Sequence, residues 1–358
     1  MTYYPIREHL ENMFKKNYRS KAFHAQTRPQ FVDWSKDFRR HLQELLGIND
    51  MRLVSNDPLL IEEVQCKGYV RQKLSIQTEL NVRMPFYLLL PEGREPGEKR
   101  AAIIACHGHS SAGKDAVAGV CDVETVAQTI EEYHYNYGEQ LAQLGYVVLV
   151  PDARGFGERR ELEQQGEEPR QLLSSSCAYL NKVAISLGQS LLGMWIFDLK
   201  CLIDYALALQ CVDGRVGCVG LSGGGMQALW LAAIDERVYC SVVSGYFYGY
   251  LEALLLSDQC ACNYVPRLWL SADIGDVAAL IAPRPLLIET GDQDSLNGSS
   301  GLANVLNQVD IVKRAMDLFS CPDNLCHYIF SGGHRWEGAT PYEWISKHMP
   351  VQLEAHHE

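Results

Sequence analysis

Residues 216–234 read VGCVGLSGGGMQALWLAAI and contain the pattern that decides the fold. An apolar, strand-like run (216–221) leads into Gly-Leu-Ser-Gly-Gly (220–224), and a helix-like run (226–234) follows. Strand, G-x-S-x-G and helix in this order form the nucleophile-elbow pattern. A serine at such a sharp turn has a strained backbone, and glycines two positions to either side leave room for it. We therefore predict that Ser222 is a nucleophile. The alternative is a glycine-rich turn that only lets the strand and the helix pack closely.

The acid and the base that activate such a serine are expected later in the chain. A serine hydroxyl becomes a nucleophile when a base takes its proton and an acid orients the base. In this topology both partners follow the serine at the ends of later strands. The strand-like run 285–290 ends in Gly-Asp-Gln-Asp (291–294), and the run 327–330 ends in Ser-Gly-Gly-His (331–334). We predict Asp294 as the acid, with Asp292 as the alternative, and His334 as the base.

Acyl transfer also requires N–H donors for the oxyanion. One donor is expected from Gly223, directly after the serine, and the second from the loop after an earlier strand. The strand-like run 101–106 is followed by HGHSSAGK (107–114), and we expect the amide of His109 to donate there.

Three other groups of residues could form a binding site. His107 and His109 could bind a metal, but no further ligands with suitable spacing accompany them. Residues 112–115 lack the glycine spacing and the Ser or Thr of a phosphate-binding loop. Cys260 and Cys262 are interpreted as two buried thiols, with a metal or redox role as the alternative. The sequence therefore predicts no metal and no cofactor.

Around the elbow, the chain alternates apolar strand-like runs with amphipathic helix-like runs. The strand-like runs are 101–106, 146–150, 216–221, 240–243, 285–290 and 327–330, and the longest helix-like runs are 191–209 and 303–319. This alternation predicts an α/β fold with a mostly parallel central sheet and helices on both faces. Three earlier runs (64–69, 74–78 and 86–90) predict an antiparallel opening of that sheet.

We expect a helical N-terminal extension (1–60) followed by a catalytic domain (61–358). A helix is predicted after Pro29, because apolar residues recur every three or four positions, at Phe31, Trp34, Phe38, Leu42 and Leu45. It should end at Gly47.

Two segments break the later alternation. Segment 157–188 is predicted to be an insertion with an exposed, charged start (158–170). Segment 246–280 is aromatic and leucine-rich, and is either a lid or a buried excursion. Tyr246, Phe247 and Trp336 are predicted to bind substrate, with core packing as the alternative.

Composition limits the partners of the protein. Lys and Arg total 32 against 44 Asp and Glu, a net charge of −12. This balance argues against nucleic acid or an anionic membrane surface as a partner.

The N-terminal residues show no signal peptide, and no apolar run is long enough to span a membrane. The twelve scattered cysteines are therefore expected to be reduced thiols in a cytoplasmic protein. The expected partner is a small-molecule ester, and a homo-oligomer is left open.

Together these motifs resemble those of the α/β-hydrolases, and more narrowly those of the dienelactone hydrolase-like and acetyl xylan esterase-like branch. The resemblance runs from about residue 64 to the C-terminus and rests on five motifs: Cys-His-Gly-His (106–109), Pro-Asp-Ala-Arg-Gly-Phe-Gly-Glu (151–158), the elbow, Asp294 and Gly-Gly-His (332–334). Phe156 and Gly223 stand where acetyl xylan esterases usually carry glutamine.

The resemblance implies roles for individual residues. Ser222 would be the nucleophile, His334 the base and Asp294 the acid of a serine hydrolase that cleaves a carboxylic ester through an acyl-enzyme. Asp152 and Arg154 would brace the loop after their strand. The alternatives are an amide, peptide or thioester hydrolase with the same triad, or a non-catalytic binding protein with this fold.

Overall fold

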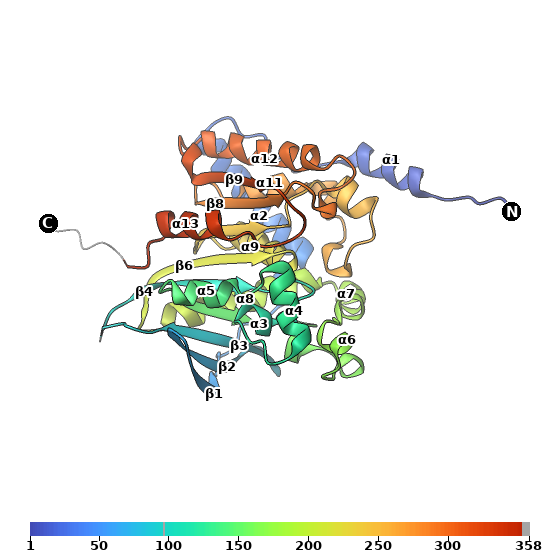
Figure 1. Cartoon of the computed structure of the whole chain (residues 1–358). Helices are drawn as coiled ribbons and strands as arrows, with labels where there is room; N and C mark the ends of the chain where they lie inside the picture. The colour runs from blue at the N-terminus through green and yellow to red at the C-terminus, as the bar shows by residue number, and fades with distance from the viewer. Residues whose placement is uncertain (96, 353–358) are drawn as a thin grey trace.

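A nine-stranded sheet runs through the molecule (Figure 1). The computed structural model describes residues 1–95 and 97–352. The strands lie in the order β1-β2-β3-β5-β4-β6-β7-β8-β9. The pairs β1–β2, β2–β3 and β3–β5 are antiparallel, and the pairs from β5–β4 to β8–β9 are parallel. The strands are Leu59–Cys66 (β1), Tyr69–Glu79 (β2), Val82–Pro91 (β3), Arg100–Cys106 (β4), Val147–Pro151 (β5), Val212–Leu221 (β6), Val238–Ser244 (β7), Leu286–Gly291 (β8) and Leu325–Phe330 (β9). The predicted fold class is confirmed.

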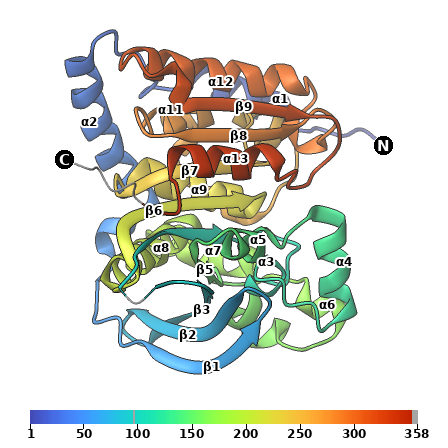
Figure 2. The same ribbon diagram turned by 60° about the vertical axis from the view of Figure 1, so that its left-hand side comes forward.

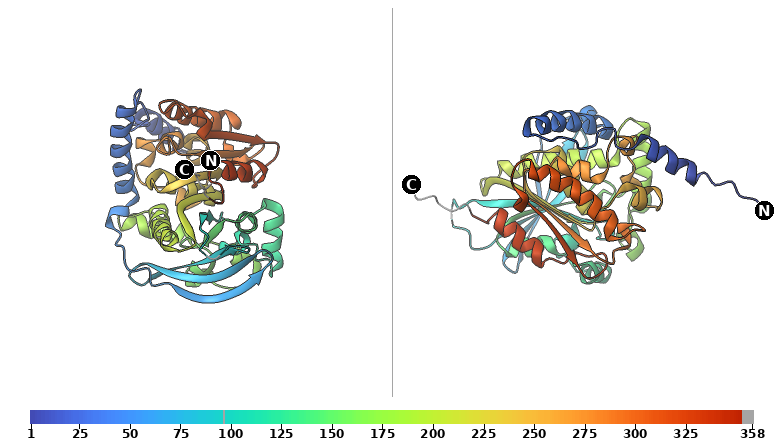
Figure 3. Two further views of the ribbon diagram at one scale, coloured as in Figure 1. Left: turned by 90° about the vertical axis from the view of Figure 1, so that its left-hand side faces the viewer. Right: turned by 90° about the horizontal axis from the view of Figure 1, so that it is seen from above.

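Helices cover both faces of this sheet, as the view from above shows (Figure 3, right). One face packs against α2 (Arg28–Leu46), α8 (Leu191–Ala208), α9 (Gly223–Ile234), α11 (Ile274–Ala279) and α12 (Leu302–Asp317). The other packs against α3 (Lys114–Val117), α4 (Glu124–Tyr133), α5 (Tyr137–Gln143) and α13 (Ala339–His348). Successive residues of β4 enter the two cores alternately and are fully buried. Burial on both faces explains why the central strands are mostly apolar.

The two long predicted helices are confirmed as α8 and α12. Several shorter helices were not predicted, because six to ten residues contain few repeats of the helical period. Among them is α13. The remaining helices are α1 (Arg7–Asn17), α6 (Pro169–Leu172), α7 (Cys177–Ser186) and α10 (Leu268–Ser271). Within the described ranges, no helix has both the length and the apolar character needed to cross a membrane.

Helix α2 of the N-terminal extension is part of the main body (Figure 2). It begins after Thr27, whose side chain caps it, and ends at Gly47, as predicted; the φ of +72° at Gly47 suits a helix-ending glycine. Its apolar stripe is buried in the same core as α8 and α9. Leu46 is fully buried there, whereas the predicted Leu45 only packs against the edge. The extension therefore contributes to the hydrophobic core of the main body.

The charged start of the insertion 157–188 is largely exposed, as predicted, and two of its residues form ion pairs with the main body. Glu158 forms ion pairs with Lys73 and Lys114, both at 2.7 Å, and Arg159 pairs with Asp198 at 2.8 Å with its side chain only 8% exposed. Arg159 therefore departs from the predicted exposure, because the buried carboxylate of Asp198 holds its guanidinium, whereas Glu158 keeps 45% of its side chain exposed. The segment continues through short 3₁₀ turns into α6 and α7.

Segment 246–280 is buried at both ends. Its aromatic start (246–250) is buried, and so is every residue of α11 at its end. For these parts the buried alternative is correct, because they fill the core beside β7 and α12. The middle (251–271) includes partly exposed residues, and its behaviour as a lid stays a prediction.

Candidate active site

Ser222 lies at the turn between β6 and α9, in the context that the elbow pattern predicts. Its backbone has a φ of +60° and a ψ of −122°, a conformation that typically costs about 1–3 kcal/mol. The Ser222 N–H donates to the carbonyl of Ser244 on the neighbouring strand, at 2.9 Å. A Cβ on Gly220 or Gly224 would overlap backbone atoms of the turn or of β4. The two flanking glycines are therefore required by the close packing of β4, β6 and α9.

Asp294 and His334 form a close pair at the ends of β8 and β9. The His334 Nδ1 lies 2.7 Å from Asp294 Oδ2, and the Asp294 side chain is 2% exposed. The second oxygen of Asp294 accepts from the N–H of Leu296 at 2.9 Å, which fixes the carboxylate. A carboxylate against Nδ1 favours the proton on that nitrogen and leaves Nε2 free to accept. Asp292 instead accepts from the Gly332 N–H at 2.9 Å and does not contact the imidazole.

The imidazole of His334 also lies close to the elbow. It packs against Gly245, where a Cβ would be 2.8 Å from His334 Cε1 and 3.0 Å from Leu221 Cδ1. Gly245 directly follows Ser244, the hydrogen-bond partner of the Ser222 amide. Serine, aspartate and histidine thus follow the carboxyl ends of β6, β8 and β9, three of four consecutive strands in the sheet. Among the hydrogen bonds of the described residues, none involves the Ser222 hydroxyl, so its partnership with His334 stays a prediction.

Glu289 of β8 holds the loop that carries His334. Its Oε1 accepts from the N–H groups of Glu337 and Gly338, both at 3.3 Å, and its Oε2 accepts from Ser244 Oγ at 2.6 Å. The side chain is fully buried, and this burial raises its pKa to about 7. Sequence reasoning missed Glu289. The only signal was a carboxylate inside an otherwise apolar strand.

The loop after β4 approaches the first turn of α9. Both ring nitrogens of His107 bind backbone: Nε2 accepts from the Ala153 N–H at 3.0 Å, and Nδ1 donates to Gly108 O at 2.8 Å. Burial lowers the pKa of His107, which is consistent with this neutral form. The His109 ring covers Gly223, where a Cβ would be 2.5 Å from Nδ1. The two predicted oxyanion donors therefore come from neighbouring residues, and their role stays a prediction.

Charged residues brace the loop after β5, as the motif comparison implied. Arg154 forms two hydrogen bonds to Asp198, at 2.7 and 2.9 Å, and one to Glu79 at 2.7 Å. Asp152 accepts from both the backbone N–H and the ammonium of Lys114, each at 2.8 Å. Lys114 is thus neutralised by carboxylates, which agrees with rejecting a phosphate-binding loop.

The predicted substrate-binding aromatics are mostly covered. Trp336 is 1% exposed, stacks on Tyr137 at 4.6 Å between ring centroids and donates its indole N–H to Tyr342. Its predicted contact with substrate is not supported, because these contacts place it in the core. Tyr246 and Phe247 lie buried just after β7, and the Tyr246 hydroxyl hydrogen-bonds Asn263 at 2.8 Å. Their binding role stays a prediction.

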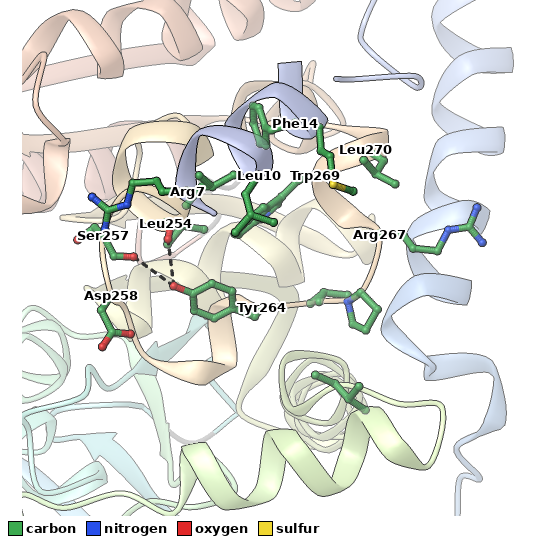
Figure 4. Close-up of a pocket in the computed structure, with 15 residues that line it drawn as sticks. Arg7, Leu10, Phe14, Leu254, Ser257, Asp258, Tyr264, Arg267, Trp269 and Leu270 are labelled. Atoms are coloured by element: carbon green, nitrogen blue, oxygen red, sulfur yellow. Dashed lines mark hydrogen bonds between the residues drawn. The ribbon is translucent and has the colours of Figure 1, made fainter. Parts of the chain in front are cut away.

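A cavity of about 660 Å³ lies between α1 and segment 254–270 (Figure 4). Leu10 and Phe14 of α1 line one side, and Tyr264 and Trp269 line the other. Tyr264 donates to the carbonyl of Leu254 at 3.0 Å. None of its lining residues belongs to the predicted triad. The cavity is a mostly apolar pocket beside α1.

A family comparison agrees with this architecture. The sequence model of the Abhydrolase family matches residues 2–331, which is most of the chain. The chain belongs to the Abhydrolase family. The match ends three residues before His334 and includes the elbow and the Asp294 loop. The predicted resemblance to α/β-hydrolases is confirmed.

Other members of this fold are named as hydrolases or esterases. Among curated proteins, "Putative hydrolase YtaP" of Bacillus subtilis (strain 168) is 27% identical over 294 residues, or 79% of this chain and 89% of YtaP. A structure named a "putative acetyl xylan esterase", from Bacteroides fragilis NCTC 9343, superposes with a TM-score of 0.74 and 18% identity, over 99% of this chain and 92% of that one.

Acetyl xylan esterase 1 from Thermoanaerobacterium sp. JW/SL YS485 has a TM-score of 0.58 at 17% identity, over 94% of this chain and 96% of that one. At these identities the two structures show a shared fold. A relationship to the dienelactone hydrolases stays a prediction.

Proposed function

We propose that this member of the Abhydrolase family is a serine hydrolase that cleaves a carboxylic ester through an acyl-enzyme on Ser222. The observation that carries the proposal is the Asp294–His334 pair, at 2.7 Å, beside the strained elbow that holds the serine. A buried carboxylate that orients an imidazole next to a nucleophile elbow is the arrangement that acyl transfer requires. The esterase names of the structural neighbours favour an ester over an amide.

The reaction begins with attack of the Ser222 hydroxyl on the ester carbonyl. His334 Nε2 takes the serine proton as the bond to the carbonyl carbon forms, and Asp294 stabilises the resulting imidazolium. The imidazolium then gives its proton to the leaving alcohol, and the C–O bond to that alcohol breaks. A water, deprotonated by the same imidazole, attacks the acyl-serine, and the acid leaves as Ser222 regains its proton.

The oxyanion of each tetrahedral intermediate is stabilised by backbone N–H groups. Gly223 is the first residue of α9, so its amide belongs to the unpaired N-terminal turn of that helix. The amide of His109 would supply the second donor from the loop after β4. Both N–H groups belong to backbone that is held in place before substrate arrives, which is what such stabilisation requires.

Replacing the serine tests this proposal. Ser222→Ala should lower kcat/KM for p-nitrophenyl acetate by at least about 10⁴-fold, because the acyl-enzyme cannot form. Thermal unfolding of the variant should show that the fold is intact. A fluorophosphonate probe should add one label to the wild-type chain, at Ser222, and none to the variant. Unchanged turnover in the variant, or a wild-type chain that takes no label, would contradict the proposal.

A further inference from the structure

Four metal-binding side chains come together beside the elbow. His109, Cys177, Cys260 and Cys262 each offer one ligand atom, and these four atoms all lie within 4.8 Å of one another. The His109 Nε2 lies 3.2 Å from the Cys262 sulfur. The four residues come from the loop after β4, the start of α7 and the 3₁₀ turn Ala261–Asn263 with the residue before it. We propose that they form a Cys3His site that binds one Zn²⁺.

The separations agree with tetrahedral coordination. A zinc ion with Zn–S bonds of about 2.3 Å has ligand sulfurs about 3.8 Å apart, so these side chains need to move by less than about 1 Å to coordinate it. Thiolate and imidazole are the donors that zinc prefers, whereas Mg²⁺ and Ca²⁺ require oxygen ligands. Four protein ligands fill the tetrahedron. The site is therefore structural, with no position left for a reacting water.

Hydrogen bonds hold the ligand-bearing segments in place independently of a metal. Asn181 of α7 is buried and donates to the carbonyls of Ala261 and Tyr264, at 2.6 and 3.2 Å. Asn263 donates to the carbonyl of Cys260 at 3.1 Å and accepts from Tyr246. Cys177 and Cys262 are themselves almost fully buried. Such outer contacts, which orient ligands before the ion binds, are typical of structural metal sites.

The ring of His109 reaches this cluster because Gly223 has no side chain. A Cβ at Gly223 would be 2.5 Å from His109 Nδ1, so any larger residue would displace the ring. The opposite ring nitrogen, Nε2, faces Cys262. A bound zinc would therefore join α7 and segment 246–280 to the loop after β4. The site itself does not depend on the proposed esterase activity.

Another close cysteine pair provides a matched comparison. The sulfurs of Cys106 and Cys218 lie 3.8 Å apart inside the sheet, where both thiols are fully buried. Within the described residues, no third ligand joins this pair to form a group that could hold a metal. Cys218→Ser is therefore a control that removes a buried thiol without touching the proposed zinc site.

Metal content of the untagged full-length protein tests the site. Purified with reductant and without chelator, the wild type should contain close to one zinc per chain by elemental mass spectrometry. Cys218→Ser and Ser222→Ala should retain it, and Cys262→Ser should lose at least nine-tenths of it. After removal of the metal, added Co²⁺ should give the visible bands of tetrahedral thiolate coordination in the wild type and in Cys218→Ser.

Three results would overturn the proposal: wild-type protein that neither contains zinc nor gives the Co²⁺ spectrum, a disulfide among the three cysteines found by non-reducing peptide mapping, or Cys262→Ser that keeps its metal. If Cys262→Ser does not fold, the zinc content and the Co²⁺ spectrum of the wild type and of Cys218→Ser still show whether the protein has the proposed zinc site. Because Ser222→Ala keeps the site, failure of the esterase proposal and failure of the zinc proposal are separate outcomes.

Discussion

At the scale of single residues, two aspartates in the loop after β8 have different partners. Asp294 contacts the imidazole of His334 and is buried, whereas Asp292 accepts a backbone N–H from Gly332 and is exposed. Both follow the strand closely, and the sequence predicted Asp294 as the acid with Asp292 as the alternative. The loop turns so that Asp294 reaches the imidazole of His334, whereas Asp292 reaches only the backbone of Gly332. Substitutions of Asp292 and Asp294 can therefore be compared directly, because the two side chains have the same charge and size and almost the same position in the loop.

We predict that Asp294→Asn lowers kcat for ester hydrolysis by about 10³- to 10⁴-fold, because the amide favours the wrong imidazole tautomer and cannot stabilise the imidazolium. Asp292→Asn should retain activity within about threefold, since an amide oxygen can still accept from Gly332. Steady-state kinetics of the two variants with one activated ester provide the comparison. Equal losses would contradict the assignment of Asp294 as the acid.

At the scale of elements, Glu289 connects β8 to the loop between β9 and α13. Its carboxyl group bridges Ser244 at the end of β7 and the backbone of residues 337–338, three residues after His334. Burial disfavours the charged form, so the pKa rises from an ordinary value of 4.5 to about 7. The folded protein thus binds the Glu289 proton more tightly than the unfolded chain does.

This pKa shift predicts a pH-dependent stability. The stabilisation from the protonated carboxyl group is fully present below about pH 4 and is lost as the pH rises through 7, and it amounts to about 3 kcal/mol. Glu289→Gln should remove this dependence, since glutamine can accept from the two N–H groups and donate to Ser244 without ionising. Urea unfolding of both proteins between pH 4.5 and 8 measures the difference. Parallel pH profiles for the two proteins would contradict the prediction.

At the scale of the whole molecule, the N-terminal helix and the sheet share one core. Phe38 of α2 is fully buried among residues that also belong to α8, α9 and α11, and Trp34 lies beside it with ring centroids 5.3 Å apart. Arg39 of the same helix donates to the carbonyls of Ala233 and Leu280. Such contacts make the extension a structural part of the catalytic body.

Accordingly, Phe38→Ala should lower the free energy of unfolding of the whole protein by about 3–5 kcal/mol, because it leaves a cavity in the shared core. Val32→Ala on the same helix, at a position 58% exposed, should change it by no more than about 0.5 kcal/mol. Denaturant unfolding followed by fluorescence and by far-UV circular dichroism should give one coincident transition. A separate early unfolding transition of α2 would show that this helix is an independent unit.

The sequence by itself determined the features that depend on neighbouring residues. Apolar runs placed the central strands, the glycines around Ser222 placed the elbow, and the order of serine, aspartate and histidine followed the strand ends. These signals are local, because strand periodicity and turn chemistry act over a few positions. The ion pairs of Glu158 with Lys114 and of Arg159 with Asp198, by contrast, were not predicted, since these partners lie far away in the chain.

Only the tertiary structure decided which distant groups meet. The order β6-β7-β8-β9 brings Glu289 beside Ser244 and the loop of His334, and the turn after β8 brings Asp294 into contact with His334. Cys177 joins Cys260 and Cys262 across more than eighty residues of chain. The physical reason is that the packing of strands and loops sets these distances, and no local pattern of residues records that packing.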